Sequence, residues 1–162
     1  VLIKDNIIKF YKKGVEYSVE EIVKTLLIEE YDYAIFHTRL ASIGNISDIN
    51  CHPYVYKNTC LAMNGTIQEL IEEASERNIT DTELVFRIVK DMNLNGTLKT
   101  LKNFGKSFAG CVNGIPYIIR GSTNQLHKWN SKNILFASTF PSDIDASLLE
   151  VTQFWFDKKE DN

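Results

Sequence analysis

The chain has 162 residues, of which 44% are hydrophobic and 24% charged, a composition typical of one globular domain that buries its own core. Its net charge is −3 and its Lys and Arg residues are dispersed, so we expect no nucleic-acid partner. No apolar run approaches the ~20 residues of a membrane span and no signal peptide opens the chain, so we expect no membrane association. The three cysteines, Cys51, Cys60 and Cys111, form no Cys-x-x-Cys pair, which predicts reduced thiols in a cytoplasmic protein.

The start of the chain predicts a hairpin, a helix and a strand. Residues 1–10 contain two apolar runs around Asp5-Asn6, a pair that suits a tight turn. Ser18 is expected to cap a helix, with Glu21 three residues later completing a capping box. The apolar run that follows predicts a strand from Tyr33 to Thr38.

The middle of the chain predicts one more strand and then helices. The strand is expected over Tyr54–Met63, and Thr66–Glu69 is expected to open a capped helix. Thr80–Glu83 opens another, Asn95-Gly96 is expected to end that region, and residues 97–104 predict a short further helix. The helix after Thr80 is expected to be buried through apolar residues at helical spacing: Leu84, Val85, Ile88, Val89 and Met92.

From Ser107 onward the pattern is that of strands. Asn113-Gly114 predicts a type I′ hairpin turn, and residues 157–162 are expected to form a frayed, charged tail. Strands are expected at residues 107–112, 115–120, 126–129, 134–138 and 151–156. Without a repeat or a linker, residues 1–162 predict a single domain of the α+β class, with helices packed on antiparallel sheets.

The stretch from Tyr33 to Thr66 carries the strongest functional signal. Two apolar runs in it each end in a short polar signature, His37-Thr38-Arg39 after the first and Asn64-Gly65-Thr66 after the second. Strand ends hold side chains rigidly and leave them accessible, so this pattern predicts a site for a small anionic ligand.

Four ordered blocks in this part of the chain resemble one family. They are His37–Gly44, Asn50–Pro53, Met63–Ile67 and Thr80–Glu83, and Ala137-Ser138 matches a later, weaker block. Together they resemble the glutaminase domain of class II glutamine amidotransferases, which are N-terminal-nucleophile hydrolases. The resemblance implies an α-β-β-α layered fold with antiparallel sheets. It also implies hydrolysis of glutamine to glutamate and ammonia, and transfer of the ammonia to an acceptor site elsewhere. We expect no cofactor and no metal.

The resemblance also implies a role for each site residue. Arg39 would hold the α-carboxylate of glutamine through the fork of its guanidinium, and Asp81 would accept hydrogen bonds from the α-ammonium group. The side chain of Asn64 and the N–H of Gly65 would form the oxyanion hole, where one donor supplies about 2.7–4 kcal/mol. Ser42 stands where the family has a Thr that contacts the substrate.

The chain departs from the family at the nucleophile. The family uses an N-terminal Cys, whereas this sequence begins at Val1, and the strand and helix that precede the family's first matching part are missing. Leu40 also replaces an aromatic residue of the family pattern. The chain as given is therefore expected to be inactive alone. Either the nucleophile segment belongs to a longer protein or to a partner chain, such as a synthase partner, or the chain is an inactive glutaminase-like module that binds a small amino acid or a protein.

Each site residue also has an ordinary explanation. Asn64-Gly65 is a strong turn signal, and Asp81 stands in the first turn of a helix, where the helix dipole favours a carboxylate. Arg39 alone would be a surface ion-pair partner. His37 and His52 fit no familiar zinc spacing, so packing or a structural hydrogen bond is the expected role of His37.

Overall fold

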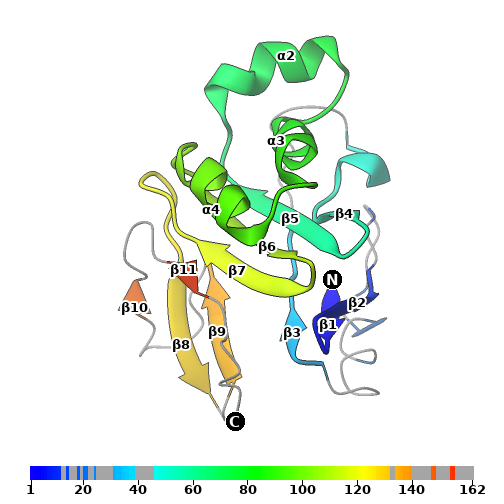
Figure 1. Cartoon of the computed structure of the whole chain (residues 1–162), viewed down its shortest axis with the longest axis vertical. Coiled ribbons are helices and arrows are strands. Elements are labelled where there is room, and N and C mark those ends of the chain that lie inside the picture. The colour runs from blue at the N-terminus through cyan, green and yellow to red at the C-terminus, as the bar shows by residue number, and fades with distance from the viewer. Residues whose placement is uncertain are drawn as a thin grey trace.

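The computed structural model describes residues 1–11, 14, 18, 20–21, 24, 31–38, 46–131, 134–139, 147–148 and 154–155. These residues form three antiparallel sheets and a group of helices (Figure 1). The combination is compatible with the α+β class. Most of the helix expected after Ser18 lies outside the described residues, as does the expected tail at 157–162.

The largest sheet has five strands in the order β11-β7-β6-β5-β4, and all neighbours in it are antiparallel. Its two longest strands, β5 and β6, are joined residue by residue from the pair Cys60 and Cys111 to the pair Asn64 and Ser107. The strands are β4 (Tyr54–Tyr56), β5 (Thr59–Asn64), β6 (Ser107–Val112), β7 (Ile115–Ile119) and β11 (Phe154–Trp155).

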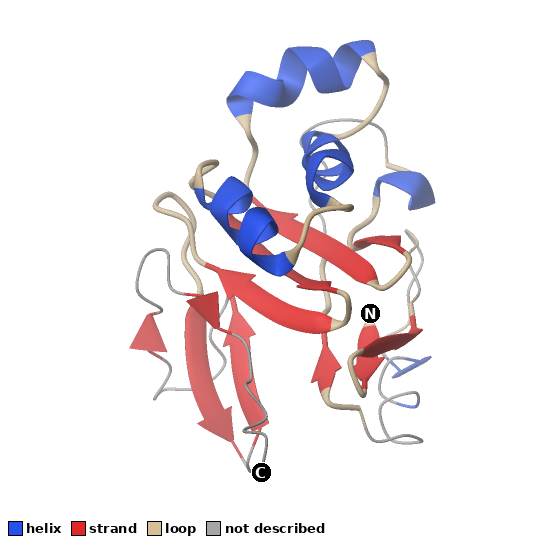
Figure 2. Cartoon of the chain, viewed as in Figure 1, coloured by secondary structure: helices blue, strands red, loops and turns tan. Residues whose placement is uncertain are grey.

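Helices cover one face of this sheet (Figure 2). The two that pack on it are α3 (Asp81–Val89) and α4 (Leu94–Lys102). Three shorter elements complete the described helices: η1 (Asp48–Asn50), η2 (Gln68–Leu70) and α2 (Ile71–Glu76). The core between sheet and helices is built from Leu61, Met63, Val85, Val89, Leu101, Phe108, Tyr117 and Ile119.

A smaller sheet lies against the opposite face. Side chains alternate between the faces of a strand, so Cys60 points away from the helices that Leu61 contacts. Cys60 and Cys111 form a second buried cluster with Val1 and Ile3. The smaller sheet has the order β2-β1-β3, with β1 (Leu2–Lys4), β2 (Ile7–Phe10) and β3 (Tyr33–Ala34). The third sheet has the order β10-β8-β9, with β8 (His127–Ser131), β9 (Ile134–Ser138) and β10 (Ser147–Leu148).

Asn58 joins three hairpin turns. Its Oδ1 accepts a hydrogen bond from the N–H of Ile8 at 2.7 Å, and its Nδ2 donates to the carbonyl of Asn6 at 2.6 Å. Its own carbonyl accepts from the N–H of Gly114 at 2.8 Å. A side chain on Gly114 would collide with Asn6, since a Cβ there would lie 1.6 Å from the Asn6 carbonyl oxygen. The β1–β2, β4–β5 and β6–β7 turns therefore lie together around Asn58.

The two tight hairpins predicted from sequence are confirmed. Asp5 and Asn6 have φ angles of 52° and 58° in the β1–β2 turn. Asn113 and Gly114 have φ angles of 51° and 76° between β6 and β7. Left-handed angles at both central residues are what a type I′ turn requires.

The two strands predicted around the central stretch are wrong in extent. β3 has two residues where Tyr33–Thr38 was expected, because its partner β1 is itself short and the side chain of Phe36 is 53% exposed. The expected strand Tyr54–Met63 is a hairpin, since Lys57 has a φ of 51° and turns the chain between β4 and β5.

The helix predictions are partly corrected. Thr66 does not cap a helix: the 3₁₀ turn η2 precedes α2, and no side chain caps either one. Asn95-Gly96 lies within α4, because the side chain of Asn93 accepts from the N–H of Gly96 at 2.8 Å and so starts that helix earlier. In α3 the predicted cap Thr80 is confirmed, whereas Ile88 is 44% exposed and Phe86 is buried in its place.

Candidate functional site

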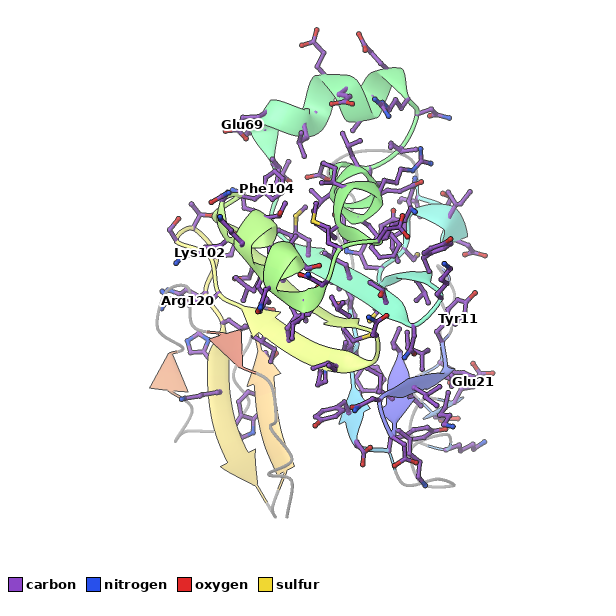
Figure 3. The ribbon with its side chains drawn as sticks, viewed as in Figure 1. Tyr11, Glu21, Glu69, Lys102, Phe104 and Arg120 are labelled. Carbon is purple, nitrogen blue, oxygen red and sulfur yellow. The ribbon has the colours of Figure 1, made fainter. Side chains whose placement is uncertain are left out.

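The predicted Asn64-Gly65 pair stands where β5 ends. Asn64 is exposed and lies opposite Ser107, the first residue of β6. Gly65 has a φ of 117°, a backbone conformation that residues with a Cβ rarely adopt. The chain therefore turns away from the sheet here, and the Asn64 side chain and Gly65 backbone are accessible at its edge. Figure 3 shows the side chains of this part of the molecule, with Glu69 and Phe104 labelled on the segments that follow Gly65 and precede Ser107.

A second loop lies directly over Gly65. A Cβ built on Gly65 would lie 2.6 Å from Asn124 Oδ1 and 3.0 Å from Lys106 Cδ. The loop is held there by Ser107, whose hydroxyl donates to the Asn124 carbonyl at 2.9 Å and accepts from the Gly121 N–H at 3.2 Å. A glycine is required at position 65 both by its backbone angle and by this close approach.

The predicted site residue Asp81 is buried, with 6% of its surface exposed. Its Oδ2 accepts a hydrogen bond from the N–H of Ile67 at 2.9 Å, and its Oδ1 accepts from the N–H of Thr82 at 2.9 Å. The first bond fixes the segment that follows Gly65 against the start of α3. Each oxygen of an ionised carboxylate has about two acceptor positions, so one position on each remains beyond these two bonds.

Thr80 and Tyr54 set the start of α3. The Thr80 Oγ1 accepts from the N–H of Glu83 at 3.0 Å, which is the N-cap bond of the helix, and it lies 2.8 Å from the Tyr54 hydroxyl. Tyr54 and Phe86 have stacked rings with centroids 6.1 Å apart. The position of Asp81 is therefore tied to the sheet through β4.

His37 brings the preceding segment to the same edge. Its Nε2 lies 3.1 Å from the Met63 carbonyl, next to Asn64 in β5. Its ring centroid is 4.2 Å from that of His52, which in turn contacts the ring of Tyr54 at 5.5 Å. The expected structural role of His37, packing or a hydrogen bond, is confirmed.

The structure thus brings three of the four motif blocks together at the end of β5, through His37 to Met63 and Asp81 to Ile67. The fourth contributes His52, whose ring contacts that of His37 at an angle of 33°. Arg39 and Ser42 lie outside the described residues, although His37 places the chain beside β5 two residues before Arg39. Over the ranges that the structure describes, no three His, Cys, Asp or Glu side chains group as metal ligands.

Sequence reasoning missed three residues near the Gly65 turn: Lys106 and Asn124, which approach it, and Ser107, which holds Asn124. Ser107 was expected only as a strand residue, and Asn124 belongs to a short polar segment between two strands. That these three residues lie near Gly65 follows only from the register of β5 with β6, which places Ser107 opposite Asn64.

Comparison with known proteins gives three partial matches and no matching family profile. The chain is similar to an enzyme named glutamine–fructose-6-phosphate aminotransferase (isomerizing) from Sulfurisphaera tokodaii, with 34% identity over 107 residues, 57% of this chain and 18% of the enzyme. An enzyme of the same name from Aquifex aeolicus is 32% identical over 62% of this chain and 19% of the enzyme. Another, from Campylobacter jejuni, is 29% identical over 49% of this chain and 15% of the enzyme. The matches thus span less than a fifth of the length of these relatives.

No helix within the described ranges is both long and apolar enough to cross a bilayer.

Proposed function

We propose that this chain is a glutamine-binding domain of the class II glutamine amidotransferase type, with its substrate site at the end of β5. The observation that carries the proposal is the hydrogen bond from Ile67 to Asp81, which joins the block containing Asn64-Gly65 to the block containing Asp81. Similarity to three enzymes whose names include glutamine supports the same substrate. The finer α-β-β-α layering of such glutaminases is part of this proposal.

The chemistry assigns one task to each residue. The Arg39 guanidinium binds the α-carboxylate of glutamine with two charge-assisted hydrogen bonds, and Ser42 is assigned a contact with the substrate. Asp81 accepts bonds from the α-ammonium group on the acceptor positions that its two backbone bonds leave. Substrate is thereby held by the two charged groups that every α-amino acid has, and its side-chain amide is directed toward Gly65.

Asn64 and Gly65 serve the developing negative charge. A tetrahedral intermediate at the glutamine amide carries an oxyanion, and the Asn64 side-chain amide and the Gly65 N–H are donors of the kind that stabilise it. These donors do not attack the substrate. In the proposed mechanism the nucleophile is an N-terminal Cys of the complete protein, and the ammonia released passes to an acceptor site outside these residues.

The test uses the natural full-length protein and measures both glutamine binding by calorimetry and glutamate release. Arg39→Ala is expected to weaken glutamine binding about 100-fold, because a bidentate charge-assisted pair contributes on the order of 3 kcal/mol. The matched control is Arg77→Ala, since Arg77 pairs with Glu73 on the exposed side of α2 and its side chain is 54% exposed. Unchanged glutamine binding and glutamate release in Arg39→Ala would contradict the proposed substrate site.

A second variant separates binding from catalysis. Asn64→Ala is expected to lower the rate of glutamate release 10²–10³-fold with little change in glutamine affinity, about the effect of losing one oxyanion donor. Glutamine binding without any glutamate release in the wild-type protein would instead identify an inactive glutaminase-like module.

A further inference from the structure

Two buried cysteines outside the proposed site face each other across the central strands. Cys60 in β5 and Cys111 in β6 are direct cross-strand partners, and their Sγ atoms are 3.3 Å apart. Both side chains are fully buried, and both are free thiols. The sequence gives no sign of the pair, because 51 positions separate the two residues.

The backbone geometry at this pair suits a covalent link. Directly opposed residues in antiparallel strands have Cα atoms about 4.5–5.5 Å apart, within the ~4.4–6.8 Å that disulfides span. The sulfurs must approach from 3.3 Å to about 2.05 Å, a shift of the order of 1 Å that side-chain rotation supplies. β5 and β6 are inner strands of the sheet, so no exposed edge has to move.

The surroundings of the pair are apolar and closed. Val1 and Ile3 cover the sulfurs, with Ile8, Tyr33, Ile35 and Val55 partly buried around them. The hydrogen bond to Cys111, together with burial, raises the pKa of the Cys60 thiol above its ordinary value. The same hydrogen bond lowers the pKa of the Cys111 thiol, so the covered position is what makes attack on an external oxidant slow while the smaller sheet is packed over β5 and β6.

The third cysteine lies elsewhere. Cys51 is half-buried and its thiol lies 3.5 Å from the Ser47 carbonyl, an acceptor next to the short helix η1. It therefore provides a matched control for the pair.

We propose that Cys60 and Cys111 are an internal dithiol–disulfide pair, oxidised to a β5–β6 cross-link by disulfide oxidants such as glutathione disulfide. One protein thiolate attacks glutathione disulfide, forming a mixed disulfide and releasing one glutathione thiolate. The second protein thiolate attacks the protein sulfur of that mixed disulfide and releases the second glutathione. Two electrons pass from the protein sulfurs to glutathione disulfide, and the two thiol protons end on two glutathione molecules.

The experiment equilibrates the natural full-length protein in buffers of reduced and oxidised glutathione, in native buffer and in urea. Equilibrium is approached both from the reduced chain and by refolding the oxidised chain, so that burial does not limit access. Free thiols are then alkylated, and peptide mapping identifies a peptide pair joined through Cys60 and Cys111. The oxidation constant of this pair is expected to be at least about tenfold larger in native buffer than in urea, because the fold holds the sulfurs together.

The variants make the assignment specific. Cys51→Ala should retain the joined peptide pair and its tenfold preference for the native state, whereas Cys60→Ala should abolish it. An oxidation constant no larger in native buffer than in urea would overturn the proposal. So would linkage of either cysteine to Cys51, or a pair that stays reduced in buffers that oxidise it in urea.

Discussion

The Asp81 carboxylate and the Ile67 N–H are joined by a 2.9 Å hydrogen bond across 14 positions of sequence. This contact connects the turn after β5 to the first residue of α3. Asp81 therefore has a structural task in the free protein whatever it binds, and variants at this position must be judged by stability as well as by affinity.

Asp81→Asn is expected to destabilise the protein by about 1.5–3 kcal/mol. The carboxamide accepts on one side only, so one of the two backbone N–H groups would face an NH₂ donor instead. Urea unfolding at neutral pH measures the change. Asp91→Asn is the matched control, because the side chain of Asp91 is 65% exposed. A cost at Asp81 no greater than at Asp91 would contradict the structural role.

Gly65→Ala is expected to cost about 1–3 kcal/mol of stability and to slow glutamate release, because the Gly65 N–H is one of the two proposed oxyanion donors. The added methyl group meets Asn124 Oδ1 at 2.6 Å, and a φ of 117° is strained for alanine. Gly96→Ala serves as the control: Gly96 lies in α4, its φ is not positive, and a Cβ there has its nearest contact at 3.3 Å. A Gly65→Ala protein as stable as Gly96→Ala would rule out the close approach of the Asn124 loop.

Thr80→Ala and Thr80→Ser together isolate the hydroxyl that starts α3. Both variants lose the buried methyl group, but only alanine also loses the N-cap bond to Glu83 and the contact with Tyr54. We expect Thr80→Ala to be less stable than Thr80→Ser by about 1–2 kcal/mol. Equal unfolding midpoints with equal denaturant slopes would show that the hydroxyl contributes nothing.

Stability is expected to fall at alkaline pH. Burial raises the pKa of Tyr117 well above its ordinary value of 10.0, and the nearby Cys60 and Cys111 add to the shift. As pH rises through that ordinary value, the unfolded chain releases the tyrosine proton first, so the free energy of unfolding decreases until the folded pKa is passed. The raised pKa of the Cys60 thiol acts in the same direction, whereas the lowered pKa of the Cys111 thiol acts in the opposite direction.

Tyr117→Phe tests this pH dependence. The variant should show a shallower decrease of the free energy of unfolding above pH ~10 than the wild type, because the contribution of the Tyr117 hydroxyl is gone. Identical slopes in Tyr117→Phe and wild type would contradict the prediction.

Local chemistry explains which parts of the fold were predictable. The turns at Asp5-Asn6 and Asn113-Gly114, and the Thr80 cap, depend on residues within a few positions of each other, and the structure has them as expected. β3 was overestimated because its length is set by the short strand that it pairs with, which sequence periodicity does not reveal.

The site was predictable only in part for the same reason. The motif blocks identified Asn64, Gly65 and Asp81, whereas Asn124 comes to Gly65 through the pairing of β5 with β6 and the Ser107 hydroxyl. Nor does the sequence indicate that the Asp81 carboxylate binds Ile67, a contact between two separate blocks. The contacts of Asn124 with Gly65 and of Asp81 with Ile67 join residues that are distant in sequence, so local sequence patterns do not predict them.

The meeting of three hairpin turns at Asn58 affects where the chain tolerates extra residues. Hairpin tips are ordinarily the places where a protein accepts insertions most easily, since few contacts hold them. Here the side chain and carbonyl of Asn58 bind Asn6, Ile8 and Gly114. A lengthened turn at any one of these tips would therefore disturb the other two. A tag, epitope or fluorescent domain is better inserted in the exposed turn between α2 and α3 than at any of these hairpins.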